Sequence, residues 1–260
     1  MKKVVVISGG ATGIGFSTAK SLLMNGYFVA IIDSDLVALN LAKEELGKIS
    51  EDFKAINFDL TDWNAGDTLF ERGDLTHVDI LINNVNFRSS ANFLSESEET
   101  WGKTFDVTVR SAFTLSQSII KKPNRCGERL YIINVGSILA NLHGAQSPSY
   151  HASKSALEGL TKYLAIEIPP LGIKVNANYL EIGFLVQNRN WQKFLSDENV
   201  KYRDLAIKHL PNGEVGRDAD VSNLIEFLTS GKADFVNGAS IKLDGGATLQ
   251  EQFELLRNLS

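Results

Sequence analysis

The 260-residue chain has little cysteine and proline and no long apolar run. Cys126 is the only cysteine, so an internal disulfide is excluded, and such sparse cysteine is typical of proteins from a reducing compartment. No apolar run approaches the length of a membrane span, and the start, MKKVVVISGG, is too short in apolar residues for a signal-peptide core. These absences predict a cytoplasmic protein that does not enter a membrane.

Positive charge is also scarce, since 26 lysines and arginines stand against 31 acidic residues and the net charge is −5. Nucleic-acid binding needs clustered basic residues, so nucleic acid is not expected as a partner. The four histidines show no spacing typical of a metal site, and we expect none. No flexible linker, repeat or low-complexity tract divides the chain, so we predict a single dinucleotide-binding and catalytic domain over residues 1–260.

Short apolar runs rich in valine and isoleucine alternate with longer amphipathic stretches. Runs without polar alternation are typical of strands covered on both faces, and the stretches between them supply the covering helices. We therefore predict an α/β fold: a Rossmann-type doubly wound parallel sheet of about seven strands with helices on both faces. Expected strands include residues 4–7, 28–32, 78–82, 130–135 and 173–175, and expected helices cover 13–25, 35–48, 97–121, 149–167 and 217–230.

A glycine-rich turn, SGGATGIG at residues 8–15, follows the first expected strand and leads into a helix. Glycines let the backbone approach a pyrophosphate, which would lie against the N–H groups at the start of that helix. Asp33 ends the second strand, where a carboxylate can accept hydrogen bonds from the adenosine ribose. A 2′-phosphate would meet this carboxylate, and neither Thr12 nor Ser34 offers a positive charge, so we predict NAD rather than NADP. A tight turn followed by an N-cap aspartate is the purely structural alternative.

The stretch PSYHASK, residues 148–154, places Tyr150 and Lys154 four residues apart, on one face of an expected helix. A nearby positive charge favours phenolate over phenol, which suits a tyrosine that acts as an acid or base. A solvated helix face carrying two unrelated polar residues is the alternative. The pair alone does not decide between the two.

Together with further motifs in chain order, these residues resemble the short-chain dehydrogenase/reductase family, in its single-domain branch of about 250 residues. The resemblance covers nearly the whole chain. The matching motifs are Ser8-Gly9 with Gly13-Ile14-Gly15, Asp59-Leu60 after the third strand, Asn83-Asn84 after the fourth, Ser137 at 13 residues before Tyr150, Tyr150 with Lys154, and the closing stretch FVNGASIKLDGG.

The resemblance implies that Tyr150 exchanges a proton with the substrate oxygen while a hydride moves to or from the nicotinamide ring. It also implies that Lys154 favours the phenolate and binds the nicotinamide ribose, and that Ser137 holds the substrate oxygen. The cofactor-binding residues expected from the turn and the resemblance are Gly9, Thr12, Gly13, Ile14, Gly15, Asp33, Asp59, Leu60, Asn83, Val85, Tyr150, Lys154 and Ile182.

Three departures from the family pattern surround the expected pocket. Thr108 occupies the position of a catalytic asparagine, and a hydroxyl anchors a relay water less fully than an amide. Asn86 stands where the family has glycine, and Leu180-Glu181 replaces Pro-Gly. The departures fit an unusual substrate and fit weakened catalysis equally well.

The resemblance places substrate contacts in two further segments. His143 and Gln146 lie between Ser137 and Tyr150, and Trp191 lies in the expected substrate loop, about residues 183–211. With Asn86 these are the substrate-contact candidates. The tail, residues 247–260, carries apolar residues at helical spacing, and relatives are commonly tetramers, so we expect a homo-oligomer, either a tetramer or a dimer.

The residues and the resemblance together predict an NAD-dependent oxidoreductase that interconverts a secondary alcohol and a ketone on a small organic substrate. Two alternatives stay open. The first is a catalytically weak or silent NAD-binding protein, which the three departures favour. The second is an NADPH-dependent 3-oxoacyl-thioester reductase, against which Asp33 argues. Substrate identity, direction and stereochemistry do not follow from the sequence.

Overall fold

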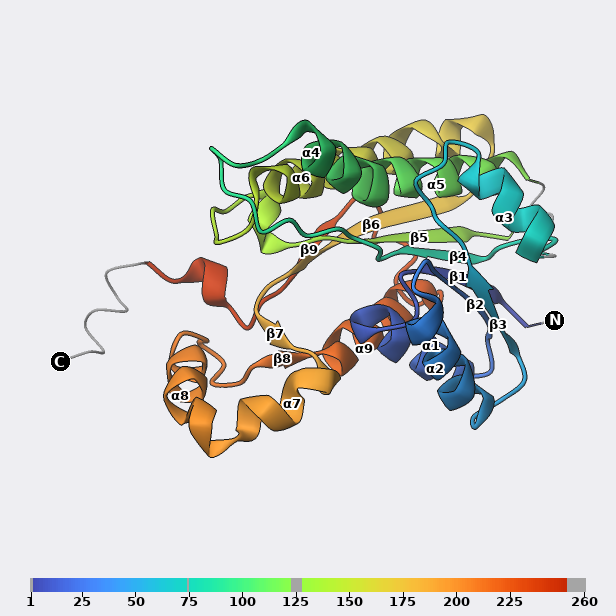
Figure 1. Ribbon diagram of the computed structural model, residues 1–260. Helices are drawn as coiled ribbons and strands as arrows, with labels where there is room; N and C mark the ends of the chain where they lie inside the picture. The colour runs from blue at the N-terminus through green and yellow to red at the C-terminus, as the bar shows by residue number, and fades with distance from the viewer. Residues whose placement is uncertain (1, 74, 123–127, 252–260) are drawn as a thin grey trace.

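The computed structural model describes residues 2–73, 75–122 and 128–251, and a seven-stranded parallel sheet forms its centre (Figure 1). The strands are β1 Val4–Ser8, β2 Phe28–Asp33, β3 Phe53–Asn57, β4 Ile80–Asn83, β5 Leu130–Val135, β6 Val175–Ile182 and β9 Ser240–Leu243. Their order is β3-β2-β1-β4-β5-β6-β9, and every neighbouring pair is parallel. The predicted Rossmann-type sheet is confirmed.

Helices cover both faces of the sheet, as predicted (Figure 1). One layer contains α1 Gly13–Met24, α2 Leu36–Gly47 and α9 Asp218–Thr229, and the other contains α3 Ala65–Gly73, α4 Glu98–Phe105, α5 Ser111–Lys121 and α6 Pro148–Glu167. Parallel strands need such crossovers, and right-handed crossovers place α1 and α2 on one face and α3 to α6 on the other because the chain reverses its direction across the sheet after β3. No helix in the described part of the chain combines the length and apolar character needed to cross a bilayer.

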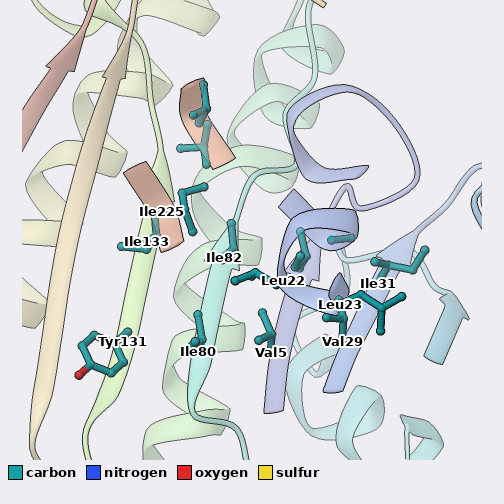
Figure 2. Packing of buried hydrophobic residues seen from close by; sticks show 14 of the residues in the cluster. Val5, Leu22, Leu23, Val29, Ile31, Ile80, Ile82, Tyr131, Ile133 and Ile225 are labelled. Carbon is teal, nitrogen blue, oxygen red and sulfur yellow. The ribbon is translucent and has the colours of Figure 1, made fainter. Parts of the chain in front are cut away.

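The apolar core lies between the sheet and each helix layer. Figure 2 shows the side that faces α1 and α9, where Val5, Ile80 and Ile133 of the strands pack with Leu22 and Ile225 of the helices. All five side chains are buried. The alternate strand residues Val6, Leu81 and Ile132 pack on the other side in a second cluster, so apolar residues fill both faces of the central strands and the strand sequences show no polar alternation.

The sixth strand differs from its prediction. The apolar run at 173–175 predicts a short strand, but β6 begins at Val175 and continues for eight residues. Asn176 and Asn178 interrupt the apolar pattern, yet both are buried because each side-chain amide donates to the Val236 carbonyl oxygen, at 2.9 and 2.8 Å. Hydrogen bonds to a distant segment thus allow polar residues in a central strand.

The helix predicted over 97–121 is not uniform. The segment η1, Asp106–Arg110, forms a π-helical turn between α4 and α5 and packs against α6. A π-helical turn adds one residue to the helical repeat and so rotates the side chains that follow. It therefore sets the direction in which Thr108 and its neighbours point.

The carboxyl ends of β1 and β4 mark the point where the chain order reverses across the sheet. In open parallel sheets ligands bind in the crevice at such a switch point. Beside it lie the short strands β7 Leu185–Val186 and β8 Gly216–Arg217, with α7 Asn188–Leu195 and α8 Val200–Lys208. Three of these elements, β7, α7 and α8, occupy most of the expected substrate loop and contribute residues to the wall of a cleft.

Candidate active site

A cavity of about 1050 Å³ opens at the carboxyl ends of the strands. The glycine turn after β1, the segment after β4, the segment after β5, α6 and the segment from the end of β6 to α8 contribute its walls. The sequence-predicted residues that line it are Gly9, Thr12, Ile14, Asp33, Val85, Asn86, Ser137, Gln146, Tyr150, Lys154 and Ile182. Segments far apart in the chain thus meet at one edge of the sheet.

The glycine turn has a conformation that glycine makes possible. Gly9 and Gly13 have φ values of +62° and +55°, in the left-handed region that favours glycine. A Cβ on Gly15 would lie 2.2 Å from the Gly9 carbonyl oxygen, so no larger residue fits there. Thr12 precedes α1 without a capping hydrogen bond from its side chain, which leaves the first N–H groups of the helix available to an anion.

Asp33 stands at the carboxyl end of β2 beside this turn. Its carboxylate accepts hydrogen bonds from the Ala11 N–H (3.2 Å) and the Asp35 N–H (3.1 Å). A carboxylate has about four lone-pair sites, so it can accept further hydrogen bonds from hydroxyl groups in the cleft. Ser34, which also lines the cleft here, brings no positive charge.

Ser8 holds the ends of β1 and β4 together. Its hydroxyl oxygen accepts from the N–H groups of Asn84 (3.0 Å) and Val85 (3.2 Å), and the Asn84 amide donates to the Gly9 carbonyl oxygen (2.9 Å). The Ser8 hydroxyl thus joins the glycine turn to the segment that follows β4.

Ser137 follows β5 and begins a short 3-10 helix, Ile138–Ala140. The hydroxyl oxygen accepts a hydrogen bond from the Leu139 N–H (3.1 Å), so its own proton remains free to be donated. The side chain lines the cleft, although the residue as a whole is buried. A donor here is suited to holding a substrate oxygen.

Tyr150 and Lys154 lie on the first turns of α6. Ser147 caps the helix by accepting from the Tyr150 N–H (3.3 Å), and Pro148 occupies the first helical position. The Lys154 ammonium lies 5.8 Å from the centroid of the Tyr150 ring. The one-turn spacing therefore places both side chains on the same face, in the cleft, as the sequence predicts.

Lys154 is buried, and its ammonium donates to the Val135 carbonyl oxygen at 2.9 Å. Burial, with a smaller contribution from the nearby Arg88 guanidinium, lowers the pKa of Lys154 to about 7. An ammonium carries three donors, so donors beyond the one held by Val135 remain for ligand hydroxyls. Anions bound nearby would favour the charged form.

Tyr179 on β6 holds the backbones of Ser137 and Lys154 in place through hydrogen bonds. Its hydroxyl oxygen accepts from the Ser137 N–H (3.0 Å), and its proton is donated to the Lys154 carbonyl oxygen (3.1 Å). The ring fits because residue 136 is glycine: a Cβ there would lie 1.8 Å from the ring. One fully buried tyrosine thus ties together the backbones of two candidate catalytic residues.

Thr108 lies in the π-helical turn and is buried. Its hydroxyl oxygen makes no hydrogen bond with the described residues and is enclosed by protein. Thr108 does not line the cleft, although Val107 does. An orphaned buried hydroxyl is rare and is suited to an ordered water or ligand group.

Several predicted cofactor residues take other positions. Asp59 is exposed and accepts from the Thr61 N–H (3.0 Å), whereas Leu60 is buried in the core next to it. Asn83 is buried and donates to the Asn134 side-chain oxygen (2.8 Å), which joins β4 to β5. None of the three lines the cleft.

Two of the predicted substrate contacts also lie outside the cleft wall. His143 stacks on His151 with ring centroids 5.6 Å apart. Trp191 stacks on Phe194 at 5.6 Å, and the Arg217 guanidinium lies 4.0 Å from the centroid of the Trp191 ring. Packing within the protein thus occupies the Trp191 side chain.

The side chains of Leu180 and Glu181, which replace Pro-Gly, do not enter the cleft. Leu180 is fully buried in the core, and Glu181 is buried and accepts from the Asn141 amide at 3.4 Å. Burial raises the pKa of the Glu181 carboxyl group. The next two residues, Ile182 and Gly183, line the cleft.

Several residues that line the cleft belong to no motif identified in the sequence, namely Phe87, Arg88, Lys103, Gln187, Arg189 and Lys193. Arg88 could have been suspected because it follows the Asn83-Asn84 motif by only a few residues. Lys103 carries no comparable signal, because its place in the cleft depends on how α4 packs. No cluster of three potential metal ligands occurs among the residues that the structure describes.

The fold and the cleft define a dinucleotide-binding enzyme of the Rossmann type. The sequence pattern of the family described as short chain dehydrogenase matches residues 3–183, so the chain belongs to this family. It is an oxidoreductase, and the family binds a nicotinamide cofactor.

Individual relatives span the whole chain. The chain is 32% identical to the 2-dehydro-3-deoxy-D-gluconate 5-dehydrogenase of Escherichia coli K12, over 94% of both chains. It is 26% identical to the 3-oxoacyl-acyl-carrier-protein reductase FabG of Salmonella typhimurium, over 94% of this chain and 96% of the relative. The solved structure of a short chain dehydrogenase from Bacillus anthracis shares the fold with a TM-score of 0.82 at 24% identity, covering 96% and 98% of the two chains.

The residues present fit a nicotinamide dinucleotide. The turn at Gly9 to Gly15 leaves no room for side chains but exposes the start of α1, which suits a pyrophosphate. Asp33 would hold the adenosine ribose, and Lys154 the nicotinamide ribose.

Proposed function

We propose that the protein is an NAD-dependent oxidoreductase that interconverts a secondary alcohol and a ketone on a small organic substrate. The observation that carries the proposal is the meeting of Ser137, Tyr150 and Lys154 in one cleft with the glycine turn and Asp33. The bound cofactor supplies the hydride acceptor or donor. The side chains of Ser137, Tyr150 and Lys154 bind the substrate and transfer the proton.

The proposed roles follow from the hydrogen bonds already described. The Ser137 hydroxyl, whose proton is free, donates to the substrate oxygen and orients it toward Tyr150. The Tyr150 hydroxyl, which has no hydrogen-bond partner within the described part of the chain, gives a proton to a ketone oxygen or takes one from an alcohol. The charge of Lys154 stabilises the phenolate that forms during alcohol oxidation.

The preference for NAD rests on charge. Asp33 stands beside the glycine turn with both carboxylate oxygens hydrogen-bonded, and neither Thr12 nor Ser34 brings a cation. A ribose 2′-hydroxyl can donate to this carboxylate, whereas a 2′-phosphate would be repelled. This repulsion also disfavours an NADPH-dependent thioester reductase, although the 26% identity to FabG keeps 3-oxoacyl thioesters in the substrate panel.

Replacing Tyr150 with phenylalanine tests the proposal. The variant removes the proton donor but keeps the ring, so we expect kcat to fall by about 100-fold or more, since general acid–base catalysis contributes roughly 10²- to 10⁴-fold. The measurement is NADH formation or consumption with a panel of secondary alcohols, sugar acids and 3-oxoacyl thioesters.

The control variant is Tyr163→Phe, because Tyr163 is 60% exposed on the outer face of α6. Undiminished turnover by Tyr150→Phe on a substrate of the wild-type protein would contradict the mechanism. NADH binding by the wild-type protein without turnover across the panel would favour a silent dinucleotide-binding protein instead.

A further inference from the structure

The end of the cleft at Tyr150 is positively charged, although the chain as a whole has a net charge of −5. The cations that line the cleft are Arg88, Lys103, Lys154, Arg189 and Lys193. Among the described lining residues Asp33 is the one acidic side chain, and it stands at the glycine turn. Five cations thus face one carboxylate among the described lining residues, and that carboxylate lies at the opposite end of the cleft from Tyr150.

The cations on α7 and those near Tyr150 have different surroundings. The segment that leads into α7 lies against the glycine turn, because a Cβ on Gly13 would meet the Gln187 amide at 2.7 Å. Arg189 and Lys193 on α7 are therefore suited to the pyrophosphate. The Arg88 guanidinium instead lies 5.6 Å from the centroid of the Tyr150 ring, at the site of proton transfer.

Arg88 is available to a ligand. It is an exposed side chain that forms no ion pair with any carboxylate in the described part of the chain, and the cleft's Asp33 is occupied by two backbone N–H groups. Lys154, the other cation beside the Tyr150 ring, is buried and already held by Val135. Arg88 thus lies beside the Tyr150 ring with no carboxylate partner among the described residues.

A second cation lies near Arg88. The Lys103 ammonium from α4 lies 4.7 Å from the centroid of the ring of Phe87, the neighbour of Arg88 in the chain, and both line the cleft. Three cations, Arg88, Lys103 and Lys154, thus line this end of the cleft, and none of the described lining residues beside them is acidic. A bound anion would relieve their mutual repulsion.

We propose that the substrate carries a carboxylate and that Arg88 binds it while Ser137 and Tyr150 hold the reacting oxygen. The planar guanidinium offers two parallel donors that match the two oxygens of a carboxylate. The carboxylate and the reacting carbon are then a few bonds apart in one small hydroxy acid or keto acid. This assignment rests on the proposed function and specifies the class of its substrate.

Binding to the protein saturated with NADH tests the assignment without requiring turnover. Isothermal titration calorimetry compares 3-hydroxybutyrate with 1,3-butanediol, and gluconate with glucitol, because within each pair only a carboxylate is exchanged for a hydroxymethyl group. We expect at least one acid to bind about 10- to 100-fold more tightly than its neutral counterpart, the range expected for a charge-assisted contact. Equal binding within both pairs would overturn the assignment.

Variants of Arg88 assign the preference to this residue. Arg88→Met should remove most of the preference for the acid, and Arg88→Lys should keep part of it because it preserves the charge without the fork. Lys43→Met is the matched control, since Lys43 is an exposed cation on α2 outside the cleft, and it should behave as the wild type does. An acid preference that survives in Arg88→Met would also overturn the assignment.

Turnover with the same compounds separates the two proposals. Oxidation of the neutral alcohols as efficiently as the acids would leave the oxidoreductase function in place and contradict the carboxylate site. A preference for binding the acid that depends on Arg88, with turnover unaffected by Tyr150→Phe, would support the carboxylate site and contradict the proposed mechanism.

Discussion

At the scale of single residues, charge and hydrogen-bond capacity decide what the cleft can bind. Asp33 accepts from two backbone N–H groups and keeps lone pairs for a ligand, whereas Ser137 accepts one hydrogen bond and keeps its proton to donate. Lys154 is buried, and this burial, together with Arg88, lowers its pKa. The two ends of the cleft thus differ in sign, with a carboxylate at one end and cations at the other.

Replacing Asp33 with alanine tests the cofactor preference at this scale. The wild-type protein is expected to bind NADH more tightly than NADPH, because only NADH offers a 2′-hydroxyl to the carboxylate. In Asp33→Ala we expect the ratio of the two dissociation constants to move toward one by about tenfold or more, since a charge-assisted hydrogen bond and a like-charge repulsion are both lost. Nicotinamide fluorescence during titration gives both constants.

The control for this titration is Asp62→Ala, in an exposed loop outside the cleft. Tighter binding of NADPH than NADH by the wild-type protein would contradict the assignment of NAD. An unchanged ratio in Asp33→Ala would mean that another part of the cleft selects the cofactor.

Some site residues are brought together by local spacing in the chain, and others only by contacts between distant elements. The pair Tyr150 and Lys154 was predictable because one helical turn brings them together. Tyr179 was not, since its contacts with Ser137 and Lys154 cross from β6 to β5 and α6. Arg88 follows a motif closely in the chain, but its position at Tyr150 depends on the path of an irregular segment.

At the scale of elements, the site depends on three neighbours, β5, β6 and α6. β5 pairs with β6 along its whole length, so Tyr179 lies opposite Asn134, close to the end of β5. The ring extends into space that Gly136 leaves empty and reaches the backbone of α6. The register of one strand pair therefore sets the relative positions of Ser137 and Lys154.

Removing the Tyr179 hydroxyl tests this connection. Tyr179→Phe leaves the buried Ser137 N–H without its partner, which costs about 1–3 kcal/mol of unfolding free energy. We expect the melting temperature to fall by roughly 2–4 °C per kcal/mol, as is usual for chains of this size. Thermal unfolding of the variant is compared with that of Tyr163→Phe, whose exposed hydroxyl should not matter. Equal melting temperatures of the two variants would show that the hydroxyl contributes nothing.

The helix before β5 shows what an amphipathic pattern cannot reveal. The stretch over 97–121 has apolar residues at helical spacing throughout, so it predicts one helix. The structure inserts the π-helical turn Asp106–Arg110, which buries Thr108 beside α6. Such a turn changes the repeat by one residue only, and its place is decided by packing against the neighbouring helix.

At the scale of the whole molecule, the surface suggests association between copies. Tyr163 and Ile166 lie three residues apart on α6 and are 60% and 68% exposed, and Phe227 on α9 is 50% exposed. Large exposed apolar residues on helix faces are common at interfaces between subunits. The predicted contribution of the tail falls mostly on residues 252–260, which lie outside the described part of the chain, as does Cys126.

One chain has a mass of 28.5 kDa, and we expect the protein in solution to have the mass of a dimer or a tetramer. Size-exclusion chromatography with light scattering measures this mass. Ile166→Glu should shift the equilibrium toward a smaller species, because a carboxylate would be buried without a partner in an interface. Val37→Glu is the matched control on α2, where Val37 is 72% exposed. A wild-type protein found only at 28.5 kDa would contradict the prediction.

The sequence by itself determined the features that depend on near neighbours in the chain. Apolar runs and amphipathic stretches predicted the layers and the parallel sheet, the glycines at residues 8–15 predicted a tight turn before the first helix, and the spacing of Tyr150 and Lys154 predicted that they share a face. Each follows from a local periodicity or from the conformational freedom of glycine. The resemblance to a known family added Ser137, whose relation to Tyr150 is not local.

Only the tertiary structure decided which other side chains enter the cleft. It placed Leu180 and Glu181 away from the cleft, buried Asn83 between two strands, and brought Arg88 beside Tyr150. These positions depend on strand register, on loop paths and on close packing between elements far apart in the chain, and no short stretch of sequence encodes them. The charge of the cleft at Tyr150, and with it the substrate class that we infer, is therefore a property of the folded molecule.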